Sequence, residues 1–330
     1  MKAVRVRKEM AEDVRKFAEK IGAKDKNRLI KFDGEFVEIP ILDGYEDNFI
    51  GFEIVKQKDP IWSSKRDFFE KISEFIPKEK ICFAPRGYKV IGDIAIVKFG
   101  DEIAEFGKKI GETILELNKR IKAVWREKSK EGMIRKPNME LLAGKGSETI
   151  HVENGCLFKL DVTKVMFSLG NQYERQRIAR ECNEEIVVDM FAGIGYFSIP
   201  CAKRAEKVYS IEINPEAFKY LLDNKKLNNT KNLIPILGDS MFITPEGIAD
   251  RVVMGHLFCA EFLPAAIRAL EKRGVIHYHE SVPEKILWRP VFRVEKMCRE
   301  LGKECKILNI RRVKNYAPGV VHVVVDAFVY

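Results

Sequence analysis

The stretch Glu185-Ile-Val-Val-Asp-Met-Phe-Ala-Gly-Ile-Gly-Tyr-Phe-Ser-Ile-Pro200 decides the fold of this chain. Its apolar run ends in Asp189, two glycines follow at Gly193 and Gly195, and apolar residues then recur at helical spacing. This order is typical of a buried parallel strand, a tight turn and the start of a helix. Because glycine has no side chain, the turn lets the backbone approach a ligand closely. The stretch therefore predicts an α/β sheet with a ligand at the end of this strand.

Two more predicted strands lead into acidic residues. The second strand, 207–212, closes on Glu212, and the third, 232–238, is followed by Asp239. Ligands of open α/β sheets bind at the carboxyl ends of the strands, and the acid after the second strand accepts ribose hydroxyls in nucleotide-binding units. We therefore expect Glu212 to hold a ribose and Asp239 to face an adenine amino group.

The glycine pattern distinguishes between two nucleotide ligands. A dinucleotide-binding turn needs a third glycine, in the order Gly-x-Gly-x-x-Gly, and none follows Gly195 at that spacing. Three acidic strand ends instead suit an adenosine that carries a cationic sulfonium tail, which predicts S-adenosylmethionine (SAM) as a group donor. The alternative is an α/β domain in which acids occupy strand ends by chance. The residues predicted to bind SAM in this unit are Asp189, Phe191, Gly193, Glu212, Ile213, Asp239 and Ser240.

The composition bounds the class of protein. The 330 residues include 58 Lys+Arg and 49 Asp+Glu, and the net charge of +9 favours a polyanionic partner. The seven cysteines are scattered without a C-x-x-C pair, which predicts reduced cytosolic thiols and no metal site. Neither a signal peptide nor an apolar stretch of membrane-spanning length is evident. We expect a cytoplasmic protein that binds no membrane.

Three units are expected along the chain. Residues 1–56 predict a small α/β unit with a hairpin at Asp33-Gly34. Residues 61–165 predict a second, α+β unit that ends in a hairpin around 153–155. Residues 166–330 predict the unit that holds the nucleotide site.

Several further motifs occur together from about residue 135 to the end of the chain. They are 140–144, 150–155, 161–164, Phe167-Ser168, Glu174-Arg175, 188–195, 224–228, 276–278 and 316–318. With these motifs, the chain resembles the archaeal and eukaryotic family that modifies the purine beside the tRNA anticodon. The resemblance implies a Rossmann-like SAM-dependent methyltransferase fold (class I) with smaller α+β domains in front, and a monomeric enzyme whose partner is tRNA.

The family has two branches that differ at the end of the fourth strand of the catalytic sheet. The guanine N1-methyltransferases carry Asn-(Leu/Pro)-Pro there, whereas this chain has Met254-Gly255-His256, followed by Glu261-Phe262. This pattern is similar to the aminocarboxypropyltransferases of wybutosine synthesis, as are 276–285 and 317–322. Cys259-Ala260 departs from that branch, which commonly has Thr-His at these positions. The pattern implies transfer of the 3-amino-3-carboxypropyl group of SAM to 4-demethylwyosine at position 37 of tRNA(Phe), with release of methylthioadenosine.

The first unit, 1–56, is similar instead to the small first domain of the methyltransferases, which grips the outer corner of tRNA. Two alternatives therefore stay open. One is a guanine N1-methyltransferase or a wyosine C-methyltransferase, which would use the same site but transfer the methyl group. The other is a non-catalytic tRNA-binding protein with a degenerate SAM pocket, against which the intact acids and glycines argue.

The resemblance also assigns residues near the reacting groups. Ser168 and Arg175 match a pair that the family uses beside SAM, and Arg175 would bind the methionine carboxylate or polarise the base. From its spacing alone, Arg175 fits an exposed helix position equally well. His256 and His279 are predicted as catalytic residues, because an imidazole can remove a proton from the base near neutral pH. His277 and His279 share one face of their strand, which either meets the base or packs against a helix.

Overall fold

The chain forms two compact units in this computed structural model. The first consists mainly of residues 1–89 and 97–126, and the second mainly of residues 145–330. No helix within the described part of the chain is both long and apolar enough to cross a membrane. The structure describes residues 1–62, 64–131 and 136–330, with the side chains of 63–67 and 129–136 left out.

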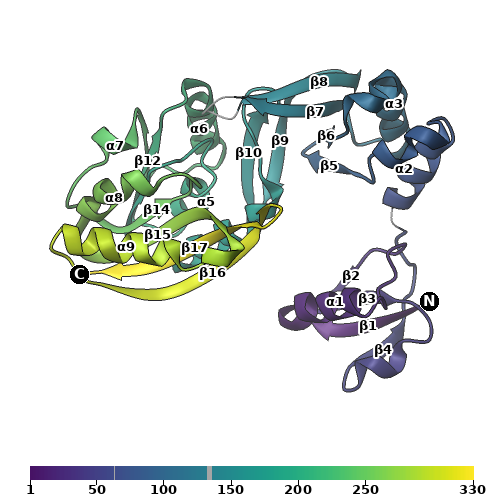
Figure 1. Ribbon diagram of the computed structural model, residues 1–330, viewed down its shortest axis with the longest axis horizontal. Helices are drawn as coiled ribbons and strands as arrows, with labels where there is room; N and C mark the ends of the chain where they lie inside the picture. The colour runs from purple at the N-terminus through teal and green to yellow at the C-terminus, as the bar shows by residue number, and fades with distance from the viewer. Residues whose placement is uncertain (63, 132–135) are drawn as a thin grey trace. The chain divides into compact units, whose positions relative to one another are not determined.

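Residues 2–56 form a four-stranded antiparallel sheet with one helix packed on it (Figure 1). The strand order is β2-β3-β1-β4, and β2 and β3 pair around the predicted hairpin at Asp33-Gly34. Val14 and Ala18 of the helix share one core with Val4 and Ile39 of the sheet. The elements are β1 (Lys2–Arg7), α1 (Ala11–Lys20), β2 (Lys31–Asp33), β3 (Phe36–Ile41) and β4 (Glu53–Lys56).

Residues 64–144 contain two helices and a four-stranded sheet in the order β5-β6-β7-β8. Phe68 of α2 and Ile110 and Ile114 of α3 are fully buried, as the apolar face of an amphipathic helix requires. The elements are α2 (Ser64–Ser73), β5 (Tyr88–Ile91), β6 (Ile94–Val97), α3 (Gly107–Leu117), β7 (Ala123–Glu131) and β8 (Lys136–Gly144).

The sheet of the second unit has seven strands in the order β13-β12-β11-β14-β15-β17-β16. The five strands from β13 to β15 are parallel, and β17 and β16 add an antiparallel edge. Right-handed crossovers from strand to strand place α5 and α6 on one face of the sheet and α7 and α8 on the other. The elements are α4 (Gln172–Glu181), β11 (Ile186–Asp189), α5 (Ser198–Ala202), β12 (Lys207–Glu212), α6 (Pro215–Leu227), β13 (Leu233–Leu237), α7 (Ser240–Ile243), β14 (Ala249–Met254), α8 (Leu263–Ala269), β15 (Leu270–Pro283), α9 (Arg289–Glu300), β16 (Cys305–Ala317) and β17 (Val320–Val329).

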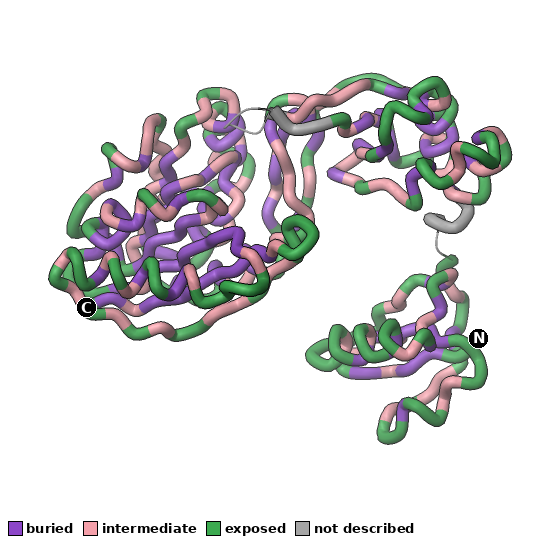
Figure 2. Tube along the Cα trace, in the orientation of Figure 1, coloured by how far each residue is buried: buried purple, intermediate pink, exposed green. Residues whose placement is uncertain are grey.

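The core of this unit follows the central strands, where the buried residues lie (Figure 2). Val188, Val252 and Ile276 are fully buried in neighbouring strands, because parallel strands that carry helices on both faces have no solvent side. α8 and α9 pack against β15, and Val294 and Cys298 of α9 join the same core.

A hairpin of β9 (Glu148–Glu153) and β10 (Cys156–Asp161) belongs to the second unit. From the sequence it is expected in the middle unit, 61–165, but Asn224 of α6 and Asn228, which caps the C-terminus of that helix, tie it to the second unit. The side chain of Asn228 accepts from the Leu157 amide at 2.9 Å and donates to the Leu157 carbonyl at 2.7 Å. Asn224 pairs in the same way with the backbone of Lys159. The two amides thus extend the edge of β10 as a neighbouring strand would.

Candidate active site

The carboxyl ends of three parallel strands meet at one edge of the seven-stranded sheet. β11 ends at Asp189, β12 ends at Glu212, and Asp239 follows β13 after one intervening glycine. The order β13-β12-β11 brings these acids to the same edge. The structure therefore assembles the three residues that the sequence predicts for a nucleotide site.

The turn after β11 depends on Gly193. Its φ of +57° lies in the left-handed region, and a Cβ at this position would collide with the ring of Tyr196. The Gly193 amide donates to Glu212 Oε2 at 2.7 Å. The glycine turn and the acid of the second strand are thus held together by a direct hydrogen bond.

Asp189 lies beneath this turn and is fully buried. Its Oδ1 accepts from the Phe191 amide at 3.3 Å, and its Oδ2 accepts from the Ser198 hydroxyl at 2.6 Å. Burial raises the pKa of the Asp189 carboxyl to about 6, although the Ser198 hydrogen bond opposes the shift. The Asp189 carboxyl is enclosed and stabilises the turn through these two hydrogen bonds, in place of the predicted contact with a ligand.

Glu212 and Asp239 are half-buried, so each keeps part of its surface in solvent. Glu212 Oε1 accepts from the Asn214 amide at 2.7 Å, and burial raises the pKa of this carboxyl. Asp239 caps α7 by accepting from the Met241 amide at 2.9 Å, and Ser240 behind it is buried. Both carboxyls can accept further hydrogen bonds from a ligand, because each oxygen has two lone pairs.

Two exposed apolar side chains flank these acids. Ile213 follows Glu212 and is 58% exposed, and Phe242 lies three residues after Asp239 and is 79% exposed. Exposed apolar surface beside a few polar acceptors suits a flat ligand with a polar rim, and the adenosine of SAM fits this description. Ile213 is among the predicted residues, whereas Phe242 is not. The signal for Phe242 is an aromatic residue in the first turn after a strand-end acid.

A row of aromatic rings runs along the same edge of the sheet. Phe191 lies 5.5 Å from the ring of His256, His256 lies 5.9 Å from Phe258, and Phe258 lies 6.2 Å from Tyr316. We call these four residues the aromatic row. His256 follows the end of β14 and Phe258 is 56% exposed. The sequence predicts Phe191 and His256 for the site, and the structure adds Phe258 and Tyr316 beside them.

Arg175 is buried, which excludes the exposed helix position that its spacing also allowed. Its Nε and Nη2 donate to the two oxygens of Glu153 at 2.8 and 2.7 Å, and Nη2 also donates to the Ser168 carbonyl at 2.8 Å. This bidentate pair joins α4 to the β9–β10 hairpin. Nη1 has no hydrogen bond to any described residue, and the guanidinium carbon lies 4.9 Å from the ring centre of Phe167 and 5.6 Å from that of Tyr196.

Ser168 lies in the segment before α4. Its hydroxyl accepts from Lys314 Nζ of β16 at 2.7 Å. Because the Ser168 carbonyl also holds Arg175, this residue places two cationic side chains next to each other. The predicted pair Ser168 and Arg175 is therefore in contact, and Lys314 joins it from a strand that the sequence does not single out.

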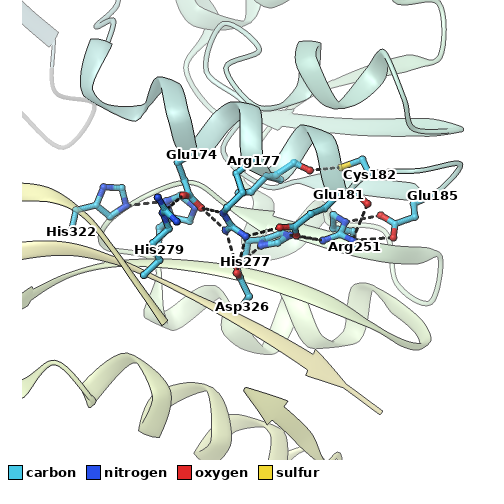
Figure 3. A network of polar contacts seen from close by, with 12 residues as sticks. Glu174, Arg177, Glu181, Cys182, Glu185, Arg251, His277, His279, His322 and Asp326 are labelled. Carbon is cyan, nitrogen blue, oxygen red and sulfur yellow. Dashed lines mark hydrogen bonds and ion pairs between the residues drawn. The ribbon is translucent and has the colours of Figure 1, made fainter. Parts of the chain in front are cut away.

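A chain of polar contacts lies between α4 and the sheet (Figure 3). His277 Nδ1 lies 2.6 Å from Asp326 Oδ1, and His277 Nε2 lies 2.6 Å from Arg251 Nη1. A guanidinium only donates, so the ring proton is on Nδ1. Asp326 also accepts from Arg177 of α4 at 2.8 Å, and Arg251 donates to Glu185 Oε2 at 2.6 Å. The histidine-bearing face of β15 is therefore packed against a helix.

His279 lies on this same face and is 1% exposed. Its Nδ1 lies 3.0 Å from Nε2 of His322, and the outer nitrogens of both rings, His279 Nε2 and His322 Nδ1, have no hydrogen-bond partner. The prediction that His279 acts on the substrate is corrected, because an enclosed ring cannot reach it. No group of three His, Cys, Asp or Glu within the described ranges is placed to hold a metal ion.

The His279–His322 pair is expected to make the stability of the fold depend on pH. Burial lowers the pKa of His279 well below its ordinary value of 6.5, and burial together with the charge of Lys314 lowers the pKa of His322 to about 4. Below pH 6.5 the unfolded chain binds protons that the folded protein does not. These two rings therefore lower the free energy of unfolding as the pH decreases from 6.5 to about 4, by at most about 1.4 kcal/mol per pH unit for each ring, whereas the raised pKa of Asp189 acts in the opposite direction below about pH 6.

Urea unfolding of the protein and of His322→Phe at several pH values between 7 and 4 measures this dependence. The variant removes one titrating ring and is expected to flatten the slope. Equal slopes for the two proteins would show that the histidine pair does not carry the effect.

Family profiles match most of the chain. The profile described as "TRM5/TYW2 methyltransferase domain" matches residues 149–308. The profile described as "TYW2 N-terminal domain" matches residues 69–147, and that described as "tRNA methyltransferase 5 N-terminal domain" matches residues 3–50. The three matches follow one another along the chain without overlap.

Similar proteins come from both branches of this family. The tRNA(Phe) (4-demethylwyosine(37)-C(7)) aminocarboxypropyltransferase of Methanocaldococcus jannaschii is 47% identical over 249 residues, which cover 73% of this chain and 96% of that protein. The tRNA (guanine(37)-N(1))-methyltransferase of Pyrococcus abyssi is 39% identical over 330 residues, which cover 98% of each chain.

Solved structures agree with these relatives. The crystal structure of Pyrococcus horikoshii TYW2 in complex with MeSAdo has a TM-score of 0.70 and 37% identity, and it covers 81% of this chain and 99% of that one. The likeness confirms the predicted Rossmann-like methyltransferase fold. On the sequence identity and on the fold, this chain belongs to the TRM5/TYW2 family.

Proposed function

We propose that this protein transfers the 3-amino-3-carboxypropyl group of SAM to 4-demethylwyosine at position 37 of tRNA(Phe). The observation that carries the proposal is the end of β14, where Met254-Gly255-His256 replaces the Asn-x-Pro of the methyltransferases. This segment leads directly into the aromatic row, a surface suited to a flat tricyclic base. The 47% identity to an aminocarboxypropyltransferase supports the same branch.

The reaction forms one carbon–carbon bond and breaks one carbon–sulfur bond. A ring carbon of the base attacks the terminal carbon of the aminocarboxypropyl group, and the electron pair of the broken bond stays on sulfur, which leaves as methylthioadenosine. The base carbon loses its proton, and the proton goes to the His256 imidazole and then to water. The donor supplies the electrophilic carbon, and the protein decides which of the three sulfonium substituents faces the base.

Different residues at the sheet edge bind different parts of SAM. Glu212 accepts hydrogen bonds from the ribose hydroxyls, and Asp239 accepts one from the adenine amino group. Ile213 and Phe242 cover the adenine ring. Ser240 follows Asp239, is buried and begins α7. Gly193 and Phe191 form the side of the pocket next to the base.

The cationic group beside Ser168 would hold the amino-acid end of the donor. Arg175 offers Nη1, and Lys314 lies within hydrogen-bond distance of the Ser168 hydroxyl. The charge of Arg175 is paired with Glu153, so Lys314 supplies the net positive charge, which attracts a carboxylate more strongly than a methyl group. This asymmetry favours an orientation that brings the carboxyl-bearing arm of the donor to this side of the pocket.

A guanine N1-methyltransferase is the second candidate, and one feature favours it. Residues 3–50 match the first domain of that branch, and the P. abyssi methyltransferase covers 98% of the chain. We propose that this first unit contacts the tRNA in either case. The tRNA affinity of a chain that begins at residue 57 tests this proposal.

The nucleoside left after the reaction distinguishes the two candidates. Incubation with SAM and tRNA(Phe) that carries 4-demethylwyosine is expected to release methylthioadenosine. tRNA that carries guanosine at the same position serves as the control and is expected to release nothing. Release of S-adenosylhomocysteine from the guanosine-bearing tRNA would instead identify the methyltransferase.

A further inference from the structure

A second surface of the catalytic unit has no part in the site described above. A hollow of about 480 Å³ runs along the outer face of α9 and the short turn before it. We call it the α9 hollow. Its lining consists of Lys285, Ile286, Trp288, Arg289, Phe292, Arg293 and Lys296.

Two large aromatic side chains stand open to solvent in this hollow. Trp288 is 63% exposed and Phe292 is 65% exposed. They are four residues apart, so they lie on the same side of the helix. The opposite side of α9 is buried through Val291 and Val294. The exposed aromatic pair therefore lies outside the apolar face by which α9 packs against the rest of the unit.

The polar residues of the hollow are all cations. Glu280 of β15 lies beneath them, is 2% exposed, and contacts Arg289 Nε at 2.6 Å and Arg293 Nη1 at 2.9 Å. One buried carboxylate thus fixes two guanidinium groups at the hollow, whose lining includes four cationic side chains in all. Lys296 also lies 3.6 Å from Glu300, but such an exposed pair contributes little.

The hollow adjoins the aromatic row through Glu280. The side chain of Glu280 holds Arg289, and its backbone pairs with Phe258. The next residue, Ser281, donates its amide to the Leu257 carbonyl at 3.3 Å. The segment after β14 and the start of α9 are therefore anchored on the same few residues of β15.

We propose that the α9 hollow binds an unpaired nucleotide of the tRNA substrate, with its base on Trp288 and Phe292 and its phosphate on the cations. Surfaces that bind single-stranded nucleic acid combine aromatic side chains with a positively charged groove, and the α9 hollow has both. The four cations beside the aromatic pair favour an anionic partner. This assignment rests on the proposed function only in that tRNA is the partner.

Two double variants test the proposal by equilibrium binding of tRNA, without turnover. Trp288→Ala/Phe292→Ala is expected to weaken tRNA binding roughly tenfold, since base stacking accounts for a loss of this size. Trp288→Phe keeps a ring and should retain most of the affinity. Lys285→Ala/Lys296→Ala is expected to weaken binding and to reduce the dependence of the affinity on salt, because fewer phosphates are neutralised.

The matched control is Lys272→Ala/Lys306→Ala, which removes the same charge from exposed positions at the opposite end of β15 and β16. It should change the tRNA affinity less than the Lys285 and Lys296 pair. SAM affinity should be the same in all variants, which also shows that they are folded. The proposal is overturned if the aromatic variant binds tRNA with the same affinity as the unchanged protein. It is equally overturned if the aromatic variant differs from the unchanged protein in sedimentation coefficient but not in tRNA affinity.

The outcome is separable from that of the proposed function. Transfer of a methyl group by the unchanged protein would revise the reaction and leave the tRNA affinities as evidence for the hollow. Absence of tRNA binding by the unchanged protein would overturn both.

Discussion

Replacing Arg175 by alanine is expected to lower the free energy of unfolding by about 3–5 kcal/mol. Arg175 and Glu153 have only 3% of each side chain exposed and share two hydrogen bonds. Burial alone raises the pKa of Glu153, and Arg175 opposes that shift. Without the guanidinium, the carboxyl is left buried beside an empty space. The hairpin and α4 then lose their main polar connection.

Chemical denaturation measures this loss, and two further variants interpret it. Arg180→Ala removes an exposed arginine from the same helix and should change stability by no more than about 0.5 kcal/mol. The double variant Arg175→Met/Glu153→Met removes both charges and should recover much of the stability, because apolar replacements of a buried pair are often tolerated. A loss below about 1 kcal/mol for Arg175→Ala would contradict the structural role of the pair.

Replacing Glu212 by alanine is expected to weaken SAM binding by about 2 kcal/mol, which is roughly a thirtyfold increase in the dissociation constant. The carboxylate is the acceptor that we assign to the ribose, and it also holds the Gly193 and Asn214 amides. Its loss therefore removes a ligand contact and loosens the glycine turn. Both effects weaken the binding of the donor.

Calorimetric titration with SAM measures the change, with Glu206→Ala as the matched control. Glu206 is exposed and immediately precedes β12, at the opposite end of the strand that Glu212 closes. The control should bind SAM as the unchanged protein does. Equal SAM affinity of Glu212→Ala and Glu206→Ala would remove Glu212 from the site.

The nucleotide edge could be predicted because its signals are local. Each strand is a short apolar run and each ends near an acid, and the turn needs a backbone conformation that glycine adopts readily. Parallel order then follows from the alternation of strands and helices, so Asp189, Glu212 and Asp239 meet without any knowledge of distant contacts. The same local pattern does not say which acid faces outward. The structure is needed to show that the Asp189 carboxyl is enclosed and bonded by the Phe191 amide and the Ser198 hydroxyl.

The pairings that depend on distant residues could not be predicted. Arg175 is buried because Glu153, twenty-two residues earlier, neutralises it. His279 is enclosed because the rings of Phe197 and His322 pack against it, with ring centroids 5.4 and 5.1 Å away. The period of two residues in a strand correctly places His277 and His279 on one face, but it cannot tell whether that face meets a helix or a substrate.

The transfer of label from SAM to tRNA tests the central claim most directly. SAM labelled in the methyl group and SAM labelled in the carboxypropyl carbons are incubated separately with the protein and tRNA(Phe) that carries 4-demethylwyosine. The account predicts carboxypropyl label on the tRNA, no methyl label, and one methylthioadenosine for each group transferred. Methyl label on the tRNA together with S-adenosylhomocysteine would contradict it.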